Sequence, residues 1–242
     1  MSDMRGRRIL TTLQEDGRLI VELAEESLPP PTGHDVVVRV EAAPINPSDL
    51  GLLFGPADLD NAEYGDGRIV ATMPEGARRA MAARVGQAMP VGNEGAGTVV
   101  AAGEAADAQA LLGKTIACVA GGMFAQYRTV DARSVIELPD NATAEQGASA
   151  FVNPLTALGF VETMRRDGHS AIVHTAAASN LGQMLLRITK EDGVPLVNIV
   201  RSPTQAAMLK DMGAEHVVDS SSDDFKAHLV AALKATGATL AF

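Results

Sequence analysis

The feature that most constrains the fold is a regular alternation of strand-like and helical segments beyond Pro139. Thr143 and Gln146 have the spacing of a helix capping box, and Gly213 and Gly237 stand where two later helices end. Strands are predicted at 171–174, 196–200, 216–218 and 239–242, and helices at 155–164, 181–190, 204–212 and 224–235. Strands separated by helices in this way predict a parallel, doubly wound sheet.

The residues before Pro139 follow another pattern, in which short β-like runs are separated by glycine and proline. An insertion at 55–90 interrupts it, and its Ala- and Arg-rich residues 75–87 predict a solvent-exposed helix. Strands are predicted at 18–22, 35–43, 97–102, 114–120 and 124–130. We therefore expect an α/β protein with a mostly β domain at 1–139 and a doubly wound domain at 140–242.

Composition excludes several classes of function. The net charge of −10 repels phosphate backbones and anionic lipid, so nucleic acid is not an expected partner. No run approaches eighteen apolar residues, so no membrane partner is expected either. Cys118 is the single cysteine and cannot form an internal disulfide, and the N-terminal residues lack the apolar core of a signal peptide. A cytoplasmic location follows as the expectation.

The turn after the first strand of the second domain lies where a nucleotide-binding fingerprint would be. Of the three glycines in a G-x-G-x-x-G motif only the third is present, as Gly182. Ala177 and Ser179 take the first two glycine positions, and the Ser179 hydroxyl is placed to contact a phosphate at the helix N-terminus. For His174, at the strand end, a structural role is expected rather than a catalytic one. The cofactor-binding residues predicted here are His174, Ala177, Ala178, Ser179, Asn180, Leu181 and Gly182.

Arg201 directly follows the second strand of this domain. An acidic residue at that position binds the ribose 2′-hydroxyl of NADH, whereas an arginine favours the 2′-phosphate of NADPH. We therefore expect NADPH as the cofactor, with Arg201 and Ser202 among its ligands; the alternative is an arginine at an ordinary loop start. A methyltransferase would place a carboxylate here, and none stands at 201–203.

Five motifs together resemble the medium-chain dehydrogenase/reductase superfamily, in its zinc-free quinone oxidoreductase and enoyl-thioester reductase branches. They are the 174–182 turn, Ala-Pro-Ile-Asn-Pro-Ser-Asp at 43–49, Gly-Asn-Glu-Gly-Ala-Gly at 92–97, Asn-Pro-Leu-Thr-Ala-Leu-Gly at 153–159 and Gly-Ala-Glu-His-Val-Val-Asp at 213–219. The resemblance spans essentially the whole chain and implies a GroES-like domain followed by a Rossmann domain. It places Asn46 and Asp49 beside the nicotinamide as candidate catalytic residues, and Asn153 and Thr156 among the cofactor-binding residues.

The departures from the superfamily concern zinc. Its zinc alcohol dehydrogenases carry a cysteine ligand near Asn46 and a histidine ligand where Asn93 stands, and Cys118 is the only cysteine here. No metal site is therefore expected. Without a Lewis acid, hydride transfer suits an acceptor that is already electron-poor, such as a quinone or an α,β-unsaturated carbonyl. Asn46 would orient the cofactor carboxamide or donate to the acceptor oxygen, although it is equally well placed as a turn residue before Pro47.

Two alternatives remain open. An enoyl-thioester reductase is the second enzyme hypothesis, but the tyrosine of that branch is expected near Ala57, and the nearest is Tyr64 within the insertion, while Tyr127 lies in a β-like run. The third hypothesis is a catalytically incomplete NADP-binding protein or fragment, because a full sheet of this type has six strands and four are predicted here. We expect a C-terminally truncated chain, and a homodimer for the full-length protein.

Overall fold

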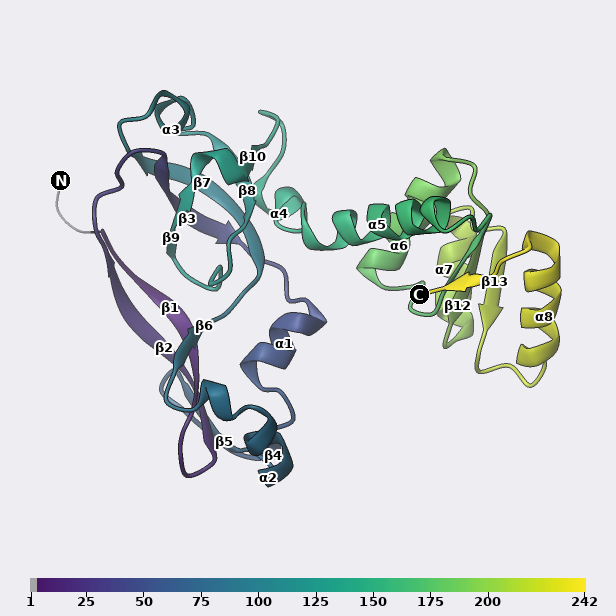
Figure 1. The fold of residues 1–242 in the computed structure, drawn as a ribbon, viewed down its shortest axis with the longest axis horizontal. Helices are drawn as coiled ribbons and strands as arrows, with labels where there is room; N and C mark the ends of the chain where they lie inside the picture. The colour runs from purple at the N-terminus through teal and green to yellow at the C-terminus, as the bar shows by residue number, and fades with distance from the viewer. Residues whose placement is uncertain (1–3) are drawn as a thin grey trace. The chain divides into compact units, whose positions relative to one another are not determined.

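The computed structural model describes residues 4–242, which form two compact units, the first ending at Phe151 and the second spanning Val152–Phe242 (Figure 1). Residues 140–151, which we assigned to the second domain, lie in the first unit. They include helix α4 (Ala144–Gly147), whose Thr143 and Gln146 form the expected capping box. Ala144 packs against Ala96 and Ala117, and this contact gives the short helix its place in the first unit.

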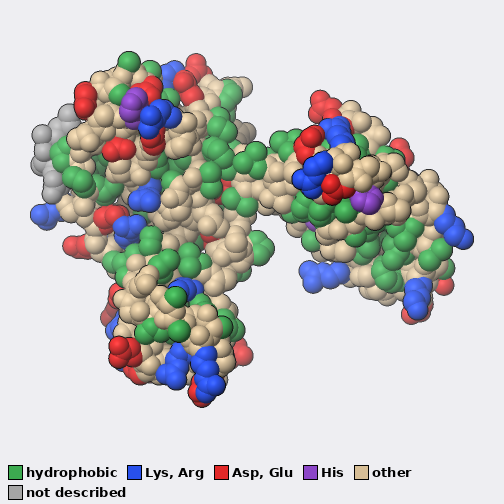
Figure 2. All heavy atoms as spheres, viewed as in Figure 1, with side chains coloured by type: hydrophobic (Ala, Val, Ile, Leu, Met, Phe, Trp, Pro, Cys, Tyr) green, Lys and Arg blue, Asp and Glu red, His purple; other side chains and the backbone are tan. Residues whose placement is uncertain are grey.

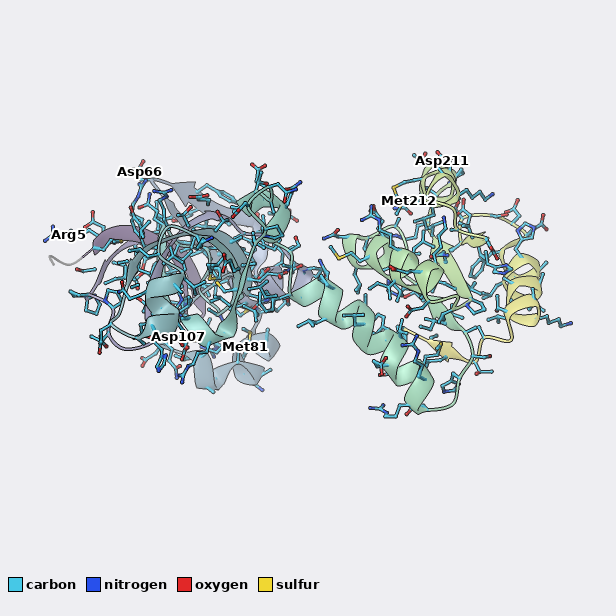
Figure 3. The ribbon with its side chains drawn as sticks, turned by 90° about the horizontal axis from the view of Figure 1, so that it is seen from above. Arg5, Asp66, Met81, Asp107, Asp211 and Met212 are labelled. Atoms are coloured by element: carbon cyan, nitrogen blue, oxygen red, sulfur yellow. The ribbon has the colours of Figure 1, made fainter. Side chains whose placement is uncertain are left out.

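The first sheet of the first unit is antiparallel and includes the insertion. Its strand order is β4-β5-β2-β1-β6, built from β1 (Met4–Leu13), β2 (Arg18–Leu28), β4 (Asp58–Gly65), β5 (Arg68–Thr72) and β6 (Ala88–Pro90). The hairpin β4–β5 turns at Asp66, labelled in Figure 3, and Gly67, both with positive φ. Such a turn matches the right-handed twist of the paired strands.

Within the insertion, the expected helix at 75–87 is shorter than predicted. Helix α2 spans Glu75–Ala80 and buries no residue, as expected of a surface helix, and a 3-10 turn, η1 (Ala82–Arg84), follows it. Strands β4 and β5 were not predicted, because the Asp- and Asn-rich β4 has little intrinsic strand propensity and is held by pairing with β5. The insertion is therefore a structural part of the sheet.

The second sheet of the first unit carries most of the strands predicted before Pro139. Its order is β10-β8-β7-β3-β9, with β3 (Asp35–Ala42), β7 (Glu94–Ala102), β8 (Thr115–Val119), β9 (Tyr127–Asp131) and β10 (Val135–Glu137). Val36, Val38, Val99 and Ile116 form the core beneath it, under α3 (Ala106–Ala110) and the turn η2 (Ala132–Ser134). Helix α1 (Pro47–Leu53) follows β3 directly.

The second unit is the predicted parallel, doubly wound sheet. Its order is β13-β12-β11-β14, with β11 (Ile172–His174), β12 (Leu196–Val200), β13 (His216–Asp219) and β14 (Leu240–Ala241). Side chains of α5 (Val152–Arg166), α6 (Asn180–Glu191) and α7 (Pro203–Asp211) cover one face, and α8 (Phe225–Thr236) covers the other (Figure 1). The stripe of Leu181, Leu185 and Ile188 faces the first of these cores, as predicted. The fold class is thereby confirmed.

Two further observations bear on function. On the face seen in Figure 2, acidic and basic side chains are interspersed. Several charged side chains of the protein form ion pairs, such as Arg39 with Glu41 and Arg133 with Asp131. Within residues 4–242, no helix combines the length and the apolar character needed to cross a membrane.

Candidate functional site

The turn between β11 and α6 brings most of the predicted cofactor-binding residues together. Ser179 caps α6, and its Oγ accepts a hydrogen bond from the Gly182 amide at 3.1 Å. A Cβ added to Gly182 would lie 2.3 Å from the Ala177 carbonyl oxygen, so only glycine allows the helix to approach the turn this closely. Among the described non-glycine residues only Asp66 has a positive φ, which explains why alanine and serine serve in this turn in place of glycine.

A cavity of about 450 Å³ opens at this turn. It is lined by Ala177, Ala178 and Ser179 from the turn and by Arg201 at the end of β12, together with Thr175, Ala176, Ile199, Val200 and Gln205. The partial positive charge at the N-terminus of α6 favours an anion there. Since the Ser179 oxygen already accepts from Gly182, its hydroxyl hydrogen is the part that is suited to bind a phosphate oxygen.

Arg201 lies at the edge of this cavity with an exposed side chain. Among the residues that the structure describes, no carboxylate pairs with its guanidinium, whereas other arginines of the second unit, such as Arg165, are paired. The Arg201 amide donates to Gln205 Oε1 at 3.0 Å, and Ser202 caps α7 by accepting from the Gln205 amide. Gln205 was not among the predicted site residues, although a serine followed three residues later by a glutamine is a recognisable signal for a helix start.

His174 is packed at the end of β11 and does not line the cavity. The residue is only 4% exposed, and its ring lies tilted against Phe160 with a centroid distance of 5.8 Å. Burial lowers the pKa of His174, and the neighbouring Phe242 backbone opposes this only in part, because neither ring nitrogen forms a hydrogen bond of normal geometry within residues 4–242. The structural role and the cofactor-binding role expected of His174 both stay predictions.

Asn153, Thr156, Asn180 and Leu181 belong to helices rather than to the turn itself. Asn153 and Thr156 are in the first turns of α5, where the Thr156 hydroxyl donates to the Val152 carbonyl at 2.6 Å. Asn180 and Leu181 begin α6, and Leu181 packs on the core of the second unit. Their contribution to cofactor binding stays a prediction.

In the first unit, Asp49 links the start of α1 to the glycine motif before β7. The residue is 1% exposed, and its two carboxylate oxygens accept from backbone amides: Oδ2 from Asn46 at 2.8 Å and Oδ1 from Asn93 at 2.9 Å. A carboxylate in the first turn of a helix is also favoured by the helix dipole. This gives Asp49 an anchoring role, and its catalytic role remains a prediction.

Asn46, the residue before α1, is 5% exposed, and its Nδ2 donates to Glu94 Oε1 at 3.1 Å. Glu94 begins β7 and is 1% exposed, and its second oxygen accepts from the Phe151 amide at 3.0 Å. Glu94 was not among the predicted site residues and was noted only as part of the 92–97 motif. A charged residue between glycines at the start of a strand that is otherwise apolar was the available signal.

The position at which the zinc enzymes carry a histidine ligand is held by Asn93, whose Nδ2 donates to Ser48 Oγ at 2.9 Å. Among residues 4–242, no three His, Cys, Asp or Glu side chains gather as a metal site would require. Cys118 is buried 3.7 Å from the Met123 sulfur, and burial raises its pKa to about 11. The absence of zinc stays a prediction.

The two tyrosines have separate surroundings. Tyr64 lies on β4, is 65% exposed, and donates its hydroxyl to the Leu59 carbonyl at 3.0 Å. Tyr127 lies on β9 beside Gly6, where an added Cβ would come within 2.8 Å of the Tyr127 ring. Neither hydroxyl forms part of the hydrogen-bond network around Asn46 that is described above.

The chain is similar in sequence and in fold to known reductases. Residues 32–140 match the alcohol dehydrogenase GroES-like domain. The human mitochondrial enoyl-[acyl-carrier-protein] reductase is 29% identical over 222 residues, which are 88% of this chain and 52% of the relative. A crystal structure from Mesorhizobium loti, described as an NADPH:quinone reductase, superposes with a TM-score of 0.71 at 29% identity, covering 98% of this chain and 66% of that one.

A mycobacterial structure complexed with NADPH has the same fold, with a TM-score of 0.68 at 23% identity, covering 98% of this chain and 66% of that one. The chain spans about half the length of the curated relatives it matches. The likeness therefore includes both units of the chain.

Proposed function

We propose that the chain is a member of the medium-chain dehydrogenase/reductase superfamily, that it binds NADPH at the β11–α6 turn, and that it acts as an NADPH-dependent reductase. The observation that carries this proposal is the cavity lined by Ser179 and Arg201, with Gly182 packed against the Ala177 carbonyl. One cavity thus combines a helix N-terminus, a hydroxyl donor and an arginine that has no carboxylate partner among the described residues. This combination fits a dinucleotide that carries an extra phosphate.

The residues of this cavity have separable tasks. The N-terminus of α6 and the Ser179 hydroxyl would hold the pyrophosphate, and the Arg201 guanidinium would hold the 2′-phosphate. Titration calorimetry with NADPH and NADH tests this assignment. We expect NADPH to bind at least tenfold more tightly, since an arginine–phosphate pair contributes about 1.5 kcal/mol or more. Equal affinities for the two cofactors would remove Arg201 from the site.

The bound cofactor would supply a hydride to an electron-poor acceptor, for which we propose a quinone or another conjugated carbonyl. Asn93, bonded to Ser48, stands where a zinc ligand would be, so polarisation of the acceptor oxygen falls to hydrogen-bond donors. Asn46 and Asp49 are proposed to lie beside the nicotinamide. Asp49 holds the start of α1 and the 92–94 segment together through the Asn46 and Asn93 amides.

A second candidate, reduction of a 2-enoyl thioester, is favoured by the curated relatives, since five of them are mitochondrial enoyl-[acyl-carrier-protein] reductases. The surroundings of Tyr64 do not favour this reaction. Tyr64 is the tyrosine nearest to the expected position, and it is exposed and donates its hydroxyl hydrogen to a carbonyl within the insertion. NADPH oxidation with a quinone and with a short enoyl thioester, measured side by side, separates the two. We expect the quinone to be turned over faster; a clear preference for the thioester, lost in Tyr64→Phe, supports the alternative.

The third candidate is NADP binding without catalysis. Calorimetry and the NADPH oxidation assay together distinguish this candidate. A protein that only binds the cofactor shows NADPH affinity by calorimetry but does not oxidise NADPH with quinones, enones or enoyl thioesters. Turnover of any one of these acceptors excludes it.

A further inference from the structure

Gln205 is a polar residue of the cofactor cavity to which the proposed function has so far given no role. It lies half-buried in the first turn of α7 and lines the same cavity as Arg201. Ser202, which we predicted as a cofactor ligand, caps α7 but does not line the cavity. The polar side chain that shares this end of the cavity with Arg201 is therefore that of Gln205.

The side-chain amide of Gln205 has a fixed direction. Its Oε1 accepts from the Arg201 backbone amide at 3.0 Å, and a backbone N–H can bond only to the oxygen end of a carboxamide. Its Nε2 has no acceptor among residues 4–242, and this nitrogen is not buried away from solvent as the ring nitrogens of His174 are. The donor hydrogens of Gln205 are thus available to a ligand.

The backbone that follows β12 has little to offer an anion. The Arg201 amide is bonded to Gln205 Oε1, the Gln205 amide is bonded to Ser202 Oγ, and Pro203 has no amide hydrogen. Donors for an anion at this edge of the cavity must therefore come mainly from side chains. The Arg201 guanidinium, which has no carboxylate partner among the described residues, and Gln205 Nε2 are such donors.

We propose that Gln205 is a specificity-determining residue of the cofactor site, whose Nε2 donates to the 2′-phosphate that Arg201 binds. This inference rests on the proposed function, which puts that phosphate at the Arg201 edge of the cavity. A hydrogen bond to an ionised oxygen is roughly twice as strong as one to a neutral oxygen, so the same Nε2 stabilises NADPH more than it stabilises the ribose hydroxyl of NADH. Arg201 supplies the charge, and Gln205 supplies a neutral donor whose direction is set by its contact with the backbone.

Two substitutions at Gln205 test this donor by calorimetry with NADPH and NADH. Gln205→Met keeps the length of the side chain but has no donor, and NADPH affinity should fall about tenfold while NADH affinity stays the same. Gln205→Glu keeps an oxygen for the Arg201 amide and replaces Nε2 by a charged oxygen that repels the phosphate. NADPH affinity should fall about thirtyfold in this variant, again without a loss of NADH affinity.

A matched control separates a contact inside the cavity from a charge in its neighbourhood. Thr204→Glu adds the same charge one position earlier on α7, at an exposed residue that does not line the cavity. It should change either affinity by less than about twofold. Both glutamate variants should unfold within about 2 °C of the parent, because acidic side chains are favoured in the first turn of a helix.

Two smaller ligands, adenosine 2′,5′-bisphosphate and 5′-AMP, locate the effect on the cofactor. They differ only in the 2′-phosphate, and neither contains the nicotinamide. The parent protein should prefer the bisphosphate at least tenfold. Most of this preference should be lost in Gln205→Glu and kept in Thr204→Glu.

The outcomes separate this inference from the proposed function. A parent-like preference for NADPH in folded Gln205→Met and Gln205→Glu overturns the inference and leaves the proposed function standing. The inference is also overturned by a parallel loss of NADPH and NADH affinity, or by equal losses in Thr204→Glu and Gln205→Glu with none in Gln205→Met. If the parent binds none of the four ligands, the proposed function fails, and the role of Gln205 fails with it.

Discussion

The candidate sites in the two units are held together in different ways. In the second unit, the Ser179 cap and the Gly182 contact join residues that lie within five positions of each other along the chain. In the first unit, Glu94 meets Asn46 and Phe151 across 48 and 57 positions, and Asp49 meets Asn93 across 44. The nucleotide turn is thus a local structure, whereas the network around Glu94 forms only when the sheet is assembled.

This difference predicts where each site is fragile. A local site depends on the backbone conformation of a few residues. A substitution that distorts this backbone should therefore impair the site while leaving distant elements folded. A non-local site depends on buried polar groups supplied by separate elements, so the loss of one acceptor leaves donors from several elements unsatisfied. The following predictions test this contrast, in order of decreasing effect.

Asp49→Ala should have the largest effect. It leaves the Asn46 and Asn93 amides without their buried acceptor, which should cost about 4 kcal/mol at roughly 2 kcal/mol for each donor. Denaturant unfolding gives the total, and hydrogen exchange of peptides shows whether the loss is confined to the first unit. Asp58→Ala, a change at an exposed carboxylate of β4, is the control and should stay within about 0.5 kcal/mol. Faster exchange throughout the second unit would contradict the contrast.

Gly182→Val should come next. Its Cβ would clash with the Ala177 carbonyl, and we expect a loss of about 3 kcal/mol, confined to the second unit, together with loss of NADPH binding. Gly159→Ala is the matched control, because nothing lies within 4 Å of its added Cβ and it should stabilise α5 by about 1 kcal/mol. Unfolding and calorimetry on both variants check this. Normal NADPH affinity in Gly182→Val would separate the turn from the cofactor.

The titration of the Cys118 thiol shows whether water reaches the core beneath the second sheet of the first unit. Burial raises its pKa from 9.0 to about 11, so the folded state holds this proton more firmly than the unfolded state does. Its contribution is therefore fully present below pH 9 and is lost as pH rises towards 11, by about 2 kcal/mol. Unfolding measured from pH 8 to 11 should show a shallower decline in Cys118→Ala than in the parent. Identical slopes would mean that the thiol is accessible to water.

Arg201→Ser should have the smallest effect and should leave the free energy of unfolding unchanged, because the exposed guanidinium has no carboxylate partner among residues 4–242. We expect NADPH affinity to fall about tenfold and NADH affinity to stay the same. Arg187→Ser, at another exposed arginine of the same unit, is the control and should change neither affinity. A parallel loss for both cofactors would assign Arg201 to the pyrophosphate instead.

The contrast between local and non-local sites also describes what was predictable. The helices and strands of the second unit, the cap at Thr143 and the close packing at Gly182 were predicted correctly, because each follows from residues close in sequence. Strands β4 and β5 were missed, since a polar segment such as 58–65 becomes a strand only through pairing with its neighbours. The contacts of Glu94 with Asn46 and Phe151 were missed for the same reason.

The sequence by itself determined that a parallel, doubly wound unit follows a mostly β one, and that a turn fit for a nucleotide lies after its first strand, because periodicity, small residues and helix caps act over a few positions. Tertiary structure alone decided that the insertion completes a sheet, that His174 is packed against Phe160, and that Glu94 faces Asn46. These contacts join residues far apart in the chain, and a buried hydrogen bond acquires its strength and its direction only when folding has removed the water between its partners.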